Sequence, residues 1–343
     1  MKILLTTPAV YTVPPIAYGG LEAIVWNLAK GLAAKGHFVE LAAPYGSATP
    51  PGGHTTQTCP PNPGNPEQLA YQVVKTSNDW LDQFEIVHDN SWQKWQYMHK
   101  SENPKSKYKL CSTLHGMNPY AQKPPVKFMN LICISQFHAL QTSGALGIPT
   151  RFVYNGIDLE QYPYQKEKGE RFLFLSRINK YKGVHEAIAA CKRLGLQLDV
   201  VGEDVFVEDP RYVLDIINSC DGKQIKYWGR VSNEKKVELL KNAKALIIPL
   251  LPPWQEPFGM MAVEAISCGT PVITTLNGAM PEIIQTGVNG FICNDLGTID
   301  IAISRINEID TQKCHESSKR FGIEQMAEGY LNLYKEILEG REW

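Results

Sequence analysis

The chain has 343 residues, of which 43% are hydrophobic and 20% charged, a composition typical of soluble globular proteins rather than of disordered segments. Lysine and arginine (34) nearly balance aspartate and glutamate (35), so no global field draws the chain to nucleic acid or to an anionic membrane. No apolar run approaches the roughly 18 residues of a membrane span, and the N-terminus lacks a signal-peptide pattern. The eight cysteines are scattered, with no C-x-x-C pair, as expected of buried thiols in a reducing compartment. We expect a cytoplasmic protein of two ordinary domains, whose membrane contact, if any, is peripheral.

The first half of the chain alternates short apolar runs with segments of helical periodicity. The expected elements are a strand at 2–6, a helix at 21–35, a strand at 38–43, a helix at 67–83 and strands at 86–88, 110–114 and 131–134. Strand, helix and strand at this spacing predict a βαβ unit, whose crossover requires a parallel sheet. Proline and glycine crowd residues 44–66, which predicts an irregular loop.

The second half restarts the same alternation. Strands are expected at 171–175, 196–202, 225–228, 245–249 and 271–274, and helices at 184–194, 233–242, 260–267 and 323–338. A charged stretch at 164–170 separates the two series, so we expect one domain over residues 1–165 and a second over 166–322. The sequence therefore predicts an α/β protein with two Rossmann-like domains, whose parallel sheets face each other across a cleft. Ligands of such sheets bind beyond the carboxyl ends of the strands.

Two glutamates separated by seven residues mark the most informative segment. Glu256 lies on the loop after the strand at 245–249, and Glu264 lies within the helix that begins near Gly259. A helix N-terminus has unpaired N–H groups and a partial positive charge, which suit a pyrophosphate. The alternative for such a pair alone is a capped, solvated helix with two incidental glutamates.

The residues that follow favour the first interpretation. After the two glutamates come Ser267-Cys268-Gly269-Thr270-Pro271, then Gly278-Ala279-Met280-Pro281-Glu282, then Gly287-Val288-Asn289-Gly290-Phe291. The run from 249 to 291 resembles the donor-site signature of the family-four retaining glycosyltransferases, which have the GT-B fold. Further matches are Gly19-Gly20-Leu21-Glu22 with the glycine-rich loop, Leu114-His115-Gly116 with the histidine of the first domain, and Ser176-Arg177 with Lys182-Gly183 as the basic pair.

The resemblance implies a role for each matching residue. Glu264 would bind the ribose of a nucleotide sugar, Glu256 would lie near the transferred sugar, and His115 would contact that sugar or orient the acceptor. The catalytic residues implied are His115, Arg177, Lys182 and Glu256. The donor-binding residues implied are Gly19, Gly20, Glu22, Phe258, Gly259, Met260, Glu264, Gly278 and Ala279. By the same resemblance, the helix at 323–338 would pack back toward the first domain.

Arg177 and Lys182 have a clear chemical task in such a site. Departure of a nucleoside diphosphate builds negative charge on the leaving oxygen, and fixed cations stabilise that charge. Arginine can make a bidentate contact, whereas lysine acts as a point charge. The sequence contains no Asp-x-Asp, so we expect no metal and no other cofactor. The resemblance implies a front-face substitution in which the leaving phosphate oxygen takes the acceptor proton, so Glu256 is not expected to be a nucleophile.

Other activities remain open on the sequence alone. A nucleotide-sugar epimerase or hydrolase of GT-B fold, or a non-catalytic nucleotide-sugar binder, would share most of these residues. The acceptor is equally open among small molecules, oligosaccharides and glycoconjugates, and no nucleic-acid partner is expected. Three aromatic residues within 90–97 either form a platform for a sugar ring or pack under the loop as part of the core.

Overall fold

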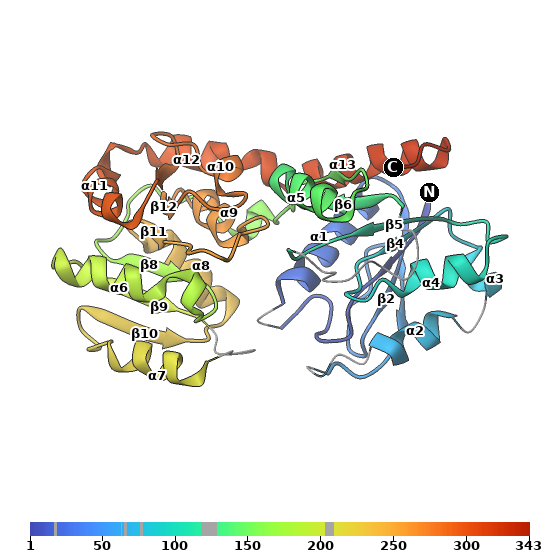
Figure 1. Ribbon diagram of the computed structural model, residues 1–343, viewed down its shortest axis with the longest axis horizontal. Coiled ribbons are helices and arrows are strands. Elements are labelled where there is room, and N and C mark those ends of the chain that lie inside the picture. Colours follow the sequence, from blue (N-terminus) through green and yellow to red (C-terminus); the bar gives the residue numbers. More distant parts are fainter. Residues whose placement is uncertain (17–18, 63, 65–66, 76–77, 118–128, 203–208) are drawn as a thin grey trace. The chain divides into compact units, whose positions relative to one another are not determined.

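The computed structural model describes residues 1–16, 19–62, 64, 67–75, 78–117, 129–202 and 209–343. These residues form two compact units (Figure 1). Unit 1 comprises Met1–Ile157 together with Phe321–Trp343, and unit 2 comprises Asp158–Arg320. Each unit is built around one parallel sheet, which confirms the predicted fold class.

Unit 1 holds a seven-stranded sheet in the order β3-β2-β1-β4-β5-β6-β7, and its paired strands run parallel. The strands are β1 Lys2–Thr6, β2 Phe38–Ala43, β3 His54–Gln57, β4 Ile86–Asp89, β5 Lys109–Thr113, β6 Leu131–Cys133 and β7 Arg151–Phe152. The helices are α1 Gly20–Ala34, α2 Glu67–Lys75, α3 Asn78–Leu81, α4 Trp95–Glu102, α5 Gln136–Leu146 and α13 Ile323–Leu338. The strands expected in this half are all present, because their apolar runs fill the sheet core.

One expectation for unit 1 was wrong. The segment 44–66, expected to be irregular, contains β3, which pairs with β2 over four residues. Its sequence His-Thr-Thr-Gln has no apolar alternation because β3 is an edge strand, held by backbone hydrogen bonds rather than by core packing. The helix expected over 67–83 is found as α2 over 67–75 and α3 over 78–81; residues 76 and 77 lie outside the described part.

The C-terminal helix α13, drawn in red in Figure 1, packs on α1 within unit 1. Gly31 of α1 permits close approach, since a Cβ there would lie 2.7 Å from Ile323 Cγ2 and 2.8 Å from Ala327 Cβ. Buried polar contacts add to this packing, as His88 Nδ1 lies 2.7 Å from the hydroxyl of Tyr334. The helix that the sequence predicts at 323–338 therefore belongs to unit 1.

Unit 2 holds a six-stranded sheet in the order β10-β9-β8-β11-β12-β13, again parallel throughout its pairs. Its strands are β8 Phe172–Leu175, β9 Leu198–Val201, β10 Ile225–Gly229, β11 Leu246–Ile248, β12 Val272–Thr275 and β13 Gly290–Cys293. Its α-helices are α6 Val184–Arg193, α7 Pro210–Asn218, α8 Asn233–Asn242, α9 Met260–Ser267, α10 Met280–Ile283, α11 Ile299–Ser304 and α12 Thr311–Ser317. Short 3₁₀ turns include η1 Leu159–Gln161, η2 Lys180–Lys182 and η5 Lys319–Phe321.

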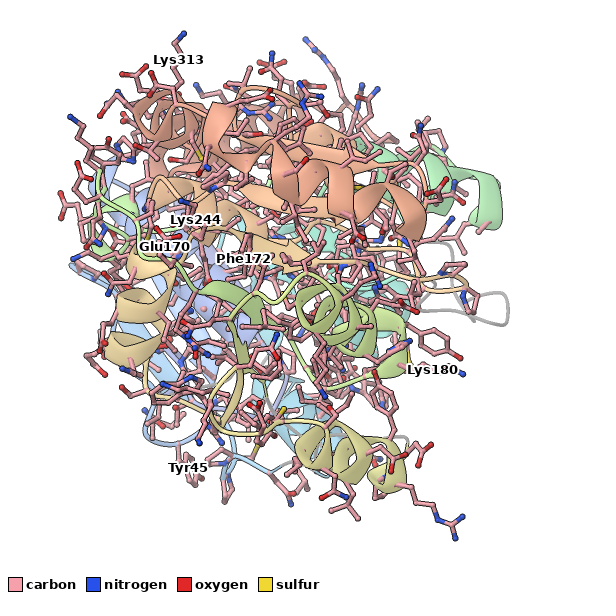
Figure 2. The ribbon with its side chains drawn as sticks, turned by 90° about the vertical axis from the view of Figure 1, so that its left-hand side faces the viewer. Tyr45, Glu170, Phe172, Lys180, Lys244 and Lys313 are labelled. Carbon is pink, nitrogen blue, oxygen red and sulfur yellow. The ribbon has the colours of Figure 1, made fainter. Side chains whose placement is uncertain are left out.

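The change between units falls at Ile157, earlier than the expected boundary after residue 165. The charged stretch at 164–170 belongs to unit 2, because the N–H of Gly169 donates to Asn242 O (2.8 Å) and Glu170 lies 3.7 Å from Lys244 (Figure 2). Backbone hydrogen bonds between Ile157 and both Phe321 (2.9 Å) and Ile323 (3.1 Å) join the two segments of unit 1 where the chain leaves and returns.

Strand order reverses once in each sheet, between β1 and β4 in unit 1 and between β8 and β11 in unit 2. At such a switch point the connections leave in opposite directions, so a crevice opens beyond the carboxyl ends of the two strands. In unit 2 this point is bordered by the loops that follow β8 and β11. These loops carry the predicted basic pair and the predicted glutamates.

Candidate functional site

The loops after β8 and β11 meet through an ion pair. Lys182 lies in η2, whose start is capped by the side chain of Asn179, which accepts a hydrogen bond from the N–H of Tyr181. The Lys182 ammonium pairs with Glu256 Oε2, and the two side chains are only 8% and 10% exposed. Two of the predicted residues, 74 positions apart in sequence, are therefore held together at the switch point.

Trp254 completes this contact. The Lys182 Nζ lies 4.7 Å from the centroid of the indole ring, within the range of a cation–π interaction. The indole Nε1–H also points at Glu256 Oε2, at 3.4 Å. One aromatic side chain thus supports both charges of the pair.

The loop carrying Glu256 is locked to the loop after β12. Asn277 Oδ1 accepts from the Glu256 N–H (2.9 Å), and Asn277 Nδ2 donates to Trp254 O (2.8 Å). The N–H of Ala279 donates to Glu256 O at 2.8 Å. Gly278 has φ +53°, and a Cβ there would lie 2.2 Å from Glu256 O, so only glycine allows this approach. The structure brings the predicted residues Gly278 and Ala279 directly against Glu256.

Helix α9 begins at this same place. Gly259, with φ +104°, precedes it and no side chain caps the helix, so N–H groups of the first turn remain without intrahelical acceptors. Phe258 is buried at 1% exposure and anchors the loop, while Met260 at the first helical position is half-buried. This end of α9 has the geometry and the dipole expected of an anion site.

Glu264 lies farther along α9 and is almost buried. Its Oε1 accepts from the Tyr162 hydroxyl (2.7 Å) and from the Lys236 ammonium (2.8 Å). Burial and the neighbouring Glu264 carboxylate raise the pKa of Tyr162 well above its usual value, so its hydroxyl remains a donor at physiological pH. Glu264 therefore lies in a small hydrogen-bonded cluster rather than on a solvated helix face.

Arg177 follows β8 and is half-buried. Among the residues that the structure describes, no hydrogen bond or ion pair holds its guanidinium. Arg177 is thus a cation at the switch point without a protein anion as partner in the described chain, whereas Lys182 pairs with Glu256 and Lys236 pairs with Glu264.

Unit 1 contains the remaining predicted residues. His115 follows β5, and its Nε2 lies 2.9 Å from Asn90 Oδ1. Asn90 Nδ2 donates to His88 O (3.4 Å), which turns the amide oxygen toward His115 and assigns the proton to Nε2. Burial, together with Lys94, lowers the pKa of His115 well below its usual value. The imidazole is therefore neutral, with Nδ1 as an acceptor.

Gly19, Gly20 and Glu22 lie at the start of α1. Gly19 has φ +148° and a Cβ there would lie 2.7 Å from Pro15 Cβ and 3.0 Å from Glu22 Oε2. Burial raises the pKa of the Glu22 carboxyl to about 7, so a large part of it is protonated near neutral pH. The helix start therefore carries less negative charge than the sequence suggests.

Comparison with known proteins follows the same division into two halves. The family model "Glycosyltransferase Family 4" matches residues 18–161, and "Glycosyl transferases group 1" matches residues 159–324. The chain belongs to the family-four glycosyltransferases. It is 25% identical over 244 residues to an uncharacterised glycosyltransferase of Methanocaldococcus jannaschii, covering 66% of this chain and 68% of that protein. It is 24% identical over 362 residues to glycogen synthase of Mycobacterium tuberculosis, covering 85% and 82%.

Solved structures share the fold of the glycosyltransferase over its whole length. AviGT4, a glycosyltransferase of avilamycin A biosynthesis, superposes with a TM-score of 0.76 at 24% identity, covering 100% of this chain and 99% of that one. HepE of Anabaena, solved with UDP-glucose, gives a TM-score of 0.71 at 19% identity, covering 99% and 100%. These likenesses establish the GT-B fold.

Four residues that contact the predicted glutamates of the glycosyltransferase had not been singled out from the sequence. Trp254 and Asn277 lie inside the run from 249 to 291, where a tryptophan two residues before the first glutamate was the available signal. Tyr162 and Lys236 lie outside that run, and no local pattern links them to Glu264. Among described residues no group of three or more His, Cys, Asp or Glu could hold a metal ion, and no described helix is long and apolar enough to cross a membrane.

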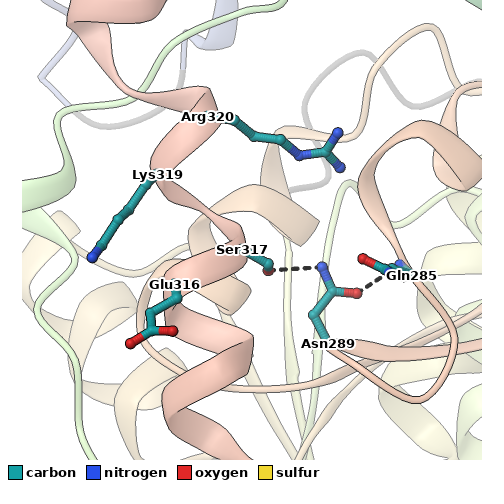
Figure 3. Close-up of a pocket in the computed structure, with 6 residues that line it drawn as sticks. All are labelled: Gln285, Asn289, Glu316, Ser317, Lys319 and Arg320. Atoms are coloured by element: carbon teal, nitrogen blue, oxygen red, sulfur yellow. Dashed lines mark hydrogen bonds between the residues drawn. The ribbon is translucent and has the colours of Figure 1, made fainter.

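A hollow of about 460 Å³ in unit 2 of the glycosyltransferase lies apart from the predicted residues (Figure 3). It is lined by Gln285, Asn289, Glu316, Ser317, Lys319 and Arg320. Its polar groups are engaged within the fold: Asn289 bonds to Ser317 and to the N–H of Gln285, and Arg320 donates to Glu282 O. Three of the lining side chains, those of Asn289, Ser317 and Arg320, are thus engaged within the fold.

Proposed function

We propose that unit 2 binds a nucleoside-diphosphate sugar and that the enzyme transfers the sugar to an acceptor hydroxyl, with retention of configuration and without a metal ion. The observation that carries this proposal is the convergence of Arg177, the Lys182–Glu256 pair and the open start of α9 at the β8/β11 switch point. Nucleotide ligands named for structural neighbours support the donor class: UDP-glucose for HepE and ADP for a plant starch synthase.

The diphosphate would lie between the N–H groups of α9 and the two cations. The acceptor oxygen attacks the anomeric carbon as the bond from that carbon to the phosphate oxygen breaks, and the departing oxygen takes the acceptor proton on the same face. Arg177 and Lys182 stabilise the negative charge that develops on this oxygen, as preorganised charges do in a water-poor site. The acceptor proton thus goes to the departing phosphate oxygen, and two protein cations stabilise its charge, so the step needs no Lewis acid.

Lys182 can serve the donor without leaving Glu256. An ammonium has three N–H donors, and the pair with Glu256 uses one of them. The other two N–H groups can contact the diphosphate, while Glu256 Oε1 accepts a hydrogen bond from a hydroxyl of the transferred sugar. The pair would then align the sugar with its leaving group, and Glu256 acts by positioning rather than as a nucleophile.

Unit 1 would supply the acceptor side. A neutral His115, whose Nδ1 accepts no hydrogen bond from the described residues, suits a hydrogen bond from a sugar or acceptor hydroxyl better than it suits acid catalysis. This role of His115, and the donor-binding roles that the resemblance implies for Gly19, Gly20 and Glu22, are part of the proposal.

A thermal-shift panel tests the donor site directly. Wild type is melted with UDP, GDP, ADP and dTDP and their common sugar conjugates in the presence of a chelator, since a ligand that binds the folded state raises Tm. We expect one nucleotide family to raise Tm, and Glu264→Ala to lose the shift. Glu308→Ala is the control, because that carboxylate pairs only with Arg305 in the described structure. A shift that requires added metal, or one that Glu264→Ala retains, contradicts the proposal.

A further inference from the structure

The hydrogen-bonded cluster of Glu264, Tyr162 and Lys236 indicates how the donor is selected. We propose that Lys236 and Tyr162 are positioning residues that fix the Glu264 carboxylate, so that the protein distinguishes a ribonucleoside diphosphate from its 2′-deoxy form. The proposal rests on the donor site described above and deepens it. Neither residue lies in the matched run from 249 to 291.

Both partners converge on one oxygen of Glu264. The Tyr162 hydroxyl donates to Oε1 at 2.7 Å and the Lys236 ammonium donates to the same atom at 2.8 Å. Lys236 Nζ also donates to the Tyr162 oxygen at 3.0 Å. The three groups form a closed triangle of hydrogen bonds, which allows little rotation of the carboxylate.

The second oxygen of Glu264 is left for a ligand. A carboxylate oxygen accepts about two hydrogen bonds, so the two donors use the capacity of Oε1. No hydrogen bond to Oε2 is found among the described residues, and the Glu264 side chain keeps 12% of its surface exposed. Oε2 is thus the oxygen available to a ribose hydroxyl, in a fixed direction.

The cluster is held by secondary structure on each side. Lys236 lies in the first turn of α8, where the Ser232 side chain caps the helix by accepting from the Lys235 N–H. Tyr162 follows η1, and its carbonyl accepts from Ser267 Oγ of α9 at 3.2 Å. The Lys236 side chain is 22% exposed, so the ammonium is shielded on most sides but still reachable.

The positive charge of Lys236 is a second reason to expect that it affects nucleotide binding. A diphosphate binding at the start of α9 would be repelled by an isolated Glu264 carboxylate on the same helix, and partial burial strengthens that repulsion. The ammonium neutralises the carboxylate and still leaves it an acceptor. Removing Lys236 is therefore expected to weaken nucleotide binding as well as to loosen the orientation of Glu264.

Calorimetric titration with the cognate nucleoside diphosphate and its 2′-deoxy form tests the proposal on the full-length protein. A lost hydrogen bond to a charged group corresponds to roughly a tenfold or larger preference for the ribo form in wild type. We expect Lys236→Met to bind the ribo form about tenfold more weakly, and its ribo/deoxy ratio to fall below about threefold. Tyr162→Phe, which keeps the ring and the ion pair, is expected to lower the ratio to a smaller extent.

The neighbouring Lys235→Met is a matched control. Lys235 lies in the same helix turn but pairs with Glu238 and packs over Trp228, so its variant should keep the wild-type ratio. A wild-type ratio retained by both Lys236→Met and Tyr162→Phe would overturn the proposal. If wild type itself binds no nucleoside diphosphate, the donor site fails, which is a separate result.

Discussion

The ammonium of Lys182 pairs with the carboxylate of Glu256, and Trp254 contacts both groups. Its ring centroid lies 4.7 Å from Lys182 Nζ, and its indole N–H points at Glu256 Oε2. This pair joins the loop after β8 to the loop after β11 at the switch point of unit 2. A buried ion pair contributes less to stability than to geometry, because desolvation offsets much of the attraction. We therefore interpret the pair as a means of holding both groups ready for the donor.

Lys182→Met is expected to separate the structural role from the functional one. Removing one partner leaves Glu256 uncompensated, which lowers the free energy of unfolding by about 3 kcal/mol. The double variant Lys182→Met/Glu256→Gln should recover most of this stability but none of the transfer activity. Urea unfolding and initial-rate assays measure the two effects. An active double variant would contradict the assigned role.

Arg177→Lys keeps the charge but loses the planar fork of the guanidinium. We expect kcat to fall about 100-fold, the usual cost of losing a transition-state contact, while KM for the donor changes only a few-fold. Arg193→Lys is the control, since Arg193 lies on the surface of the same unit and pairs with Asp300. Equal kinetics for the two variants would exclude Arg177 from the leaving-group site.

Gly278→Ala should disrupt the loop that carries Glu256. The added Cβ would fall 2.2 Å from Glu256 O, whereas at Gly287, also of positive φ (+83°), a Cβ meets nothing within 4 Å. Both variants incur the backbone strain of about 1 kcal/mol, but only Gly278→Ala adds a clash. We expect it to lose nucleotide binding, measured by calorimetry, while Gly287→Ala retains it. Retained binding in both would mean that this loop does not shape the site.

The sequence predicted most of the fold because apolar runs and helical periodicity report core packing. Strand β3 was missed because an edge strand needs no apolar alternation, and its four residues are polar or β-branched. At the site, motif spacing identified Glu256 and Glu264 but not their partners. Lys236 reaches Glu264 through the packing of α8 beside α9, a tertiary contact that no local pattern encodes.

We expect the buried His88 to make unit 1 sensitive to acid. Burial lowers the pKa of His88 to about 3, below the unfolded value of about 6.5, so between these values only the unfolded chain binds the proton. Stability is therefore present above pH 6.5 and falls by about 1.4 kcal/mol per pH unit as pH drops through this window.

His88→Gln should reduce this slope in urea unfolding series between about pH 7 and pH 4.5, by one proton's worth. It should also lower stability at pH 7, because His88 bonds to Tyr334 and Thr113. His54→Gln, with a largely exposed ring, is the control. Identical slopes for wild type and His88→Gln would show that His88 does not drive the acid sensitivity.

The most direct test of the account is release of nucleoside diphosphate from the cognate nucleotide sugar, measured with excess chelator and a mixture of sugar acceptors for wild type and Arg177→Ala. We expect turnover by wild type that added divalent metal does not increase. We also expect a rate at least about 100-fold lower for Arg177→Ala. Turnover that requires metal, or an Arg177→Ala rate equal to that of wild type, would contradict a donor site in which protein cations stabilise the leaving diphosphate.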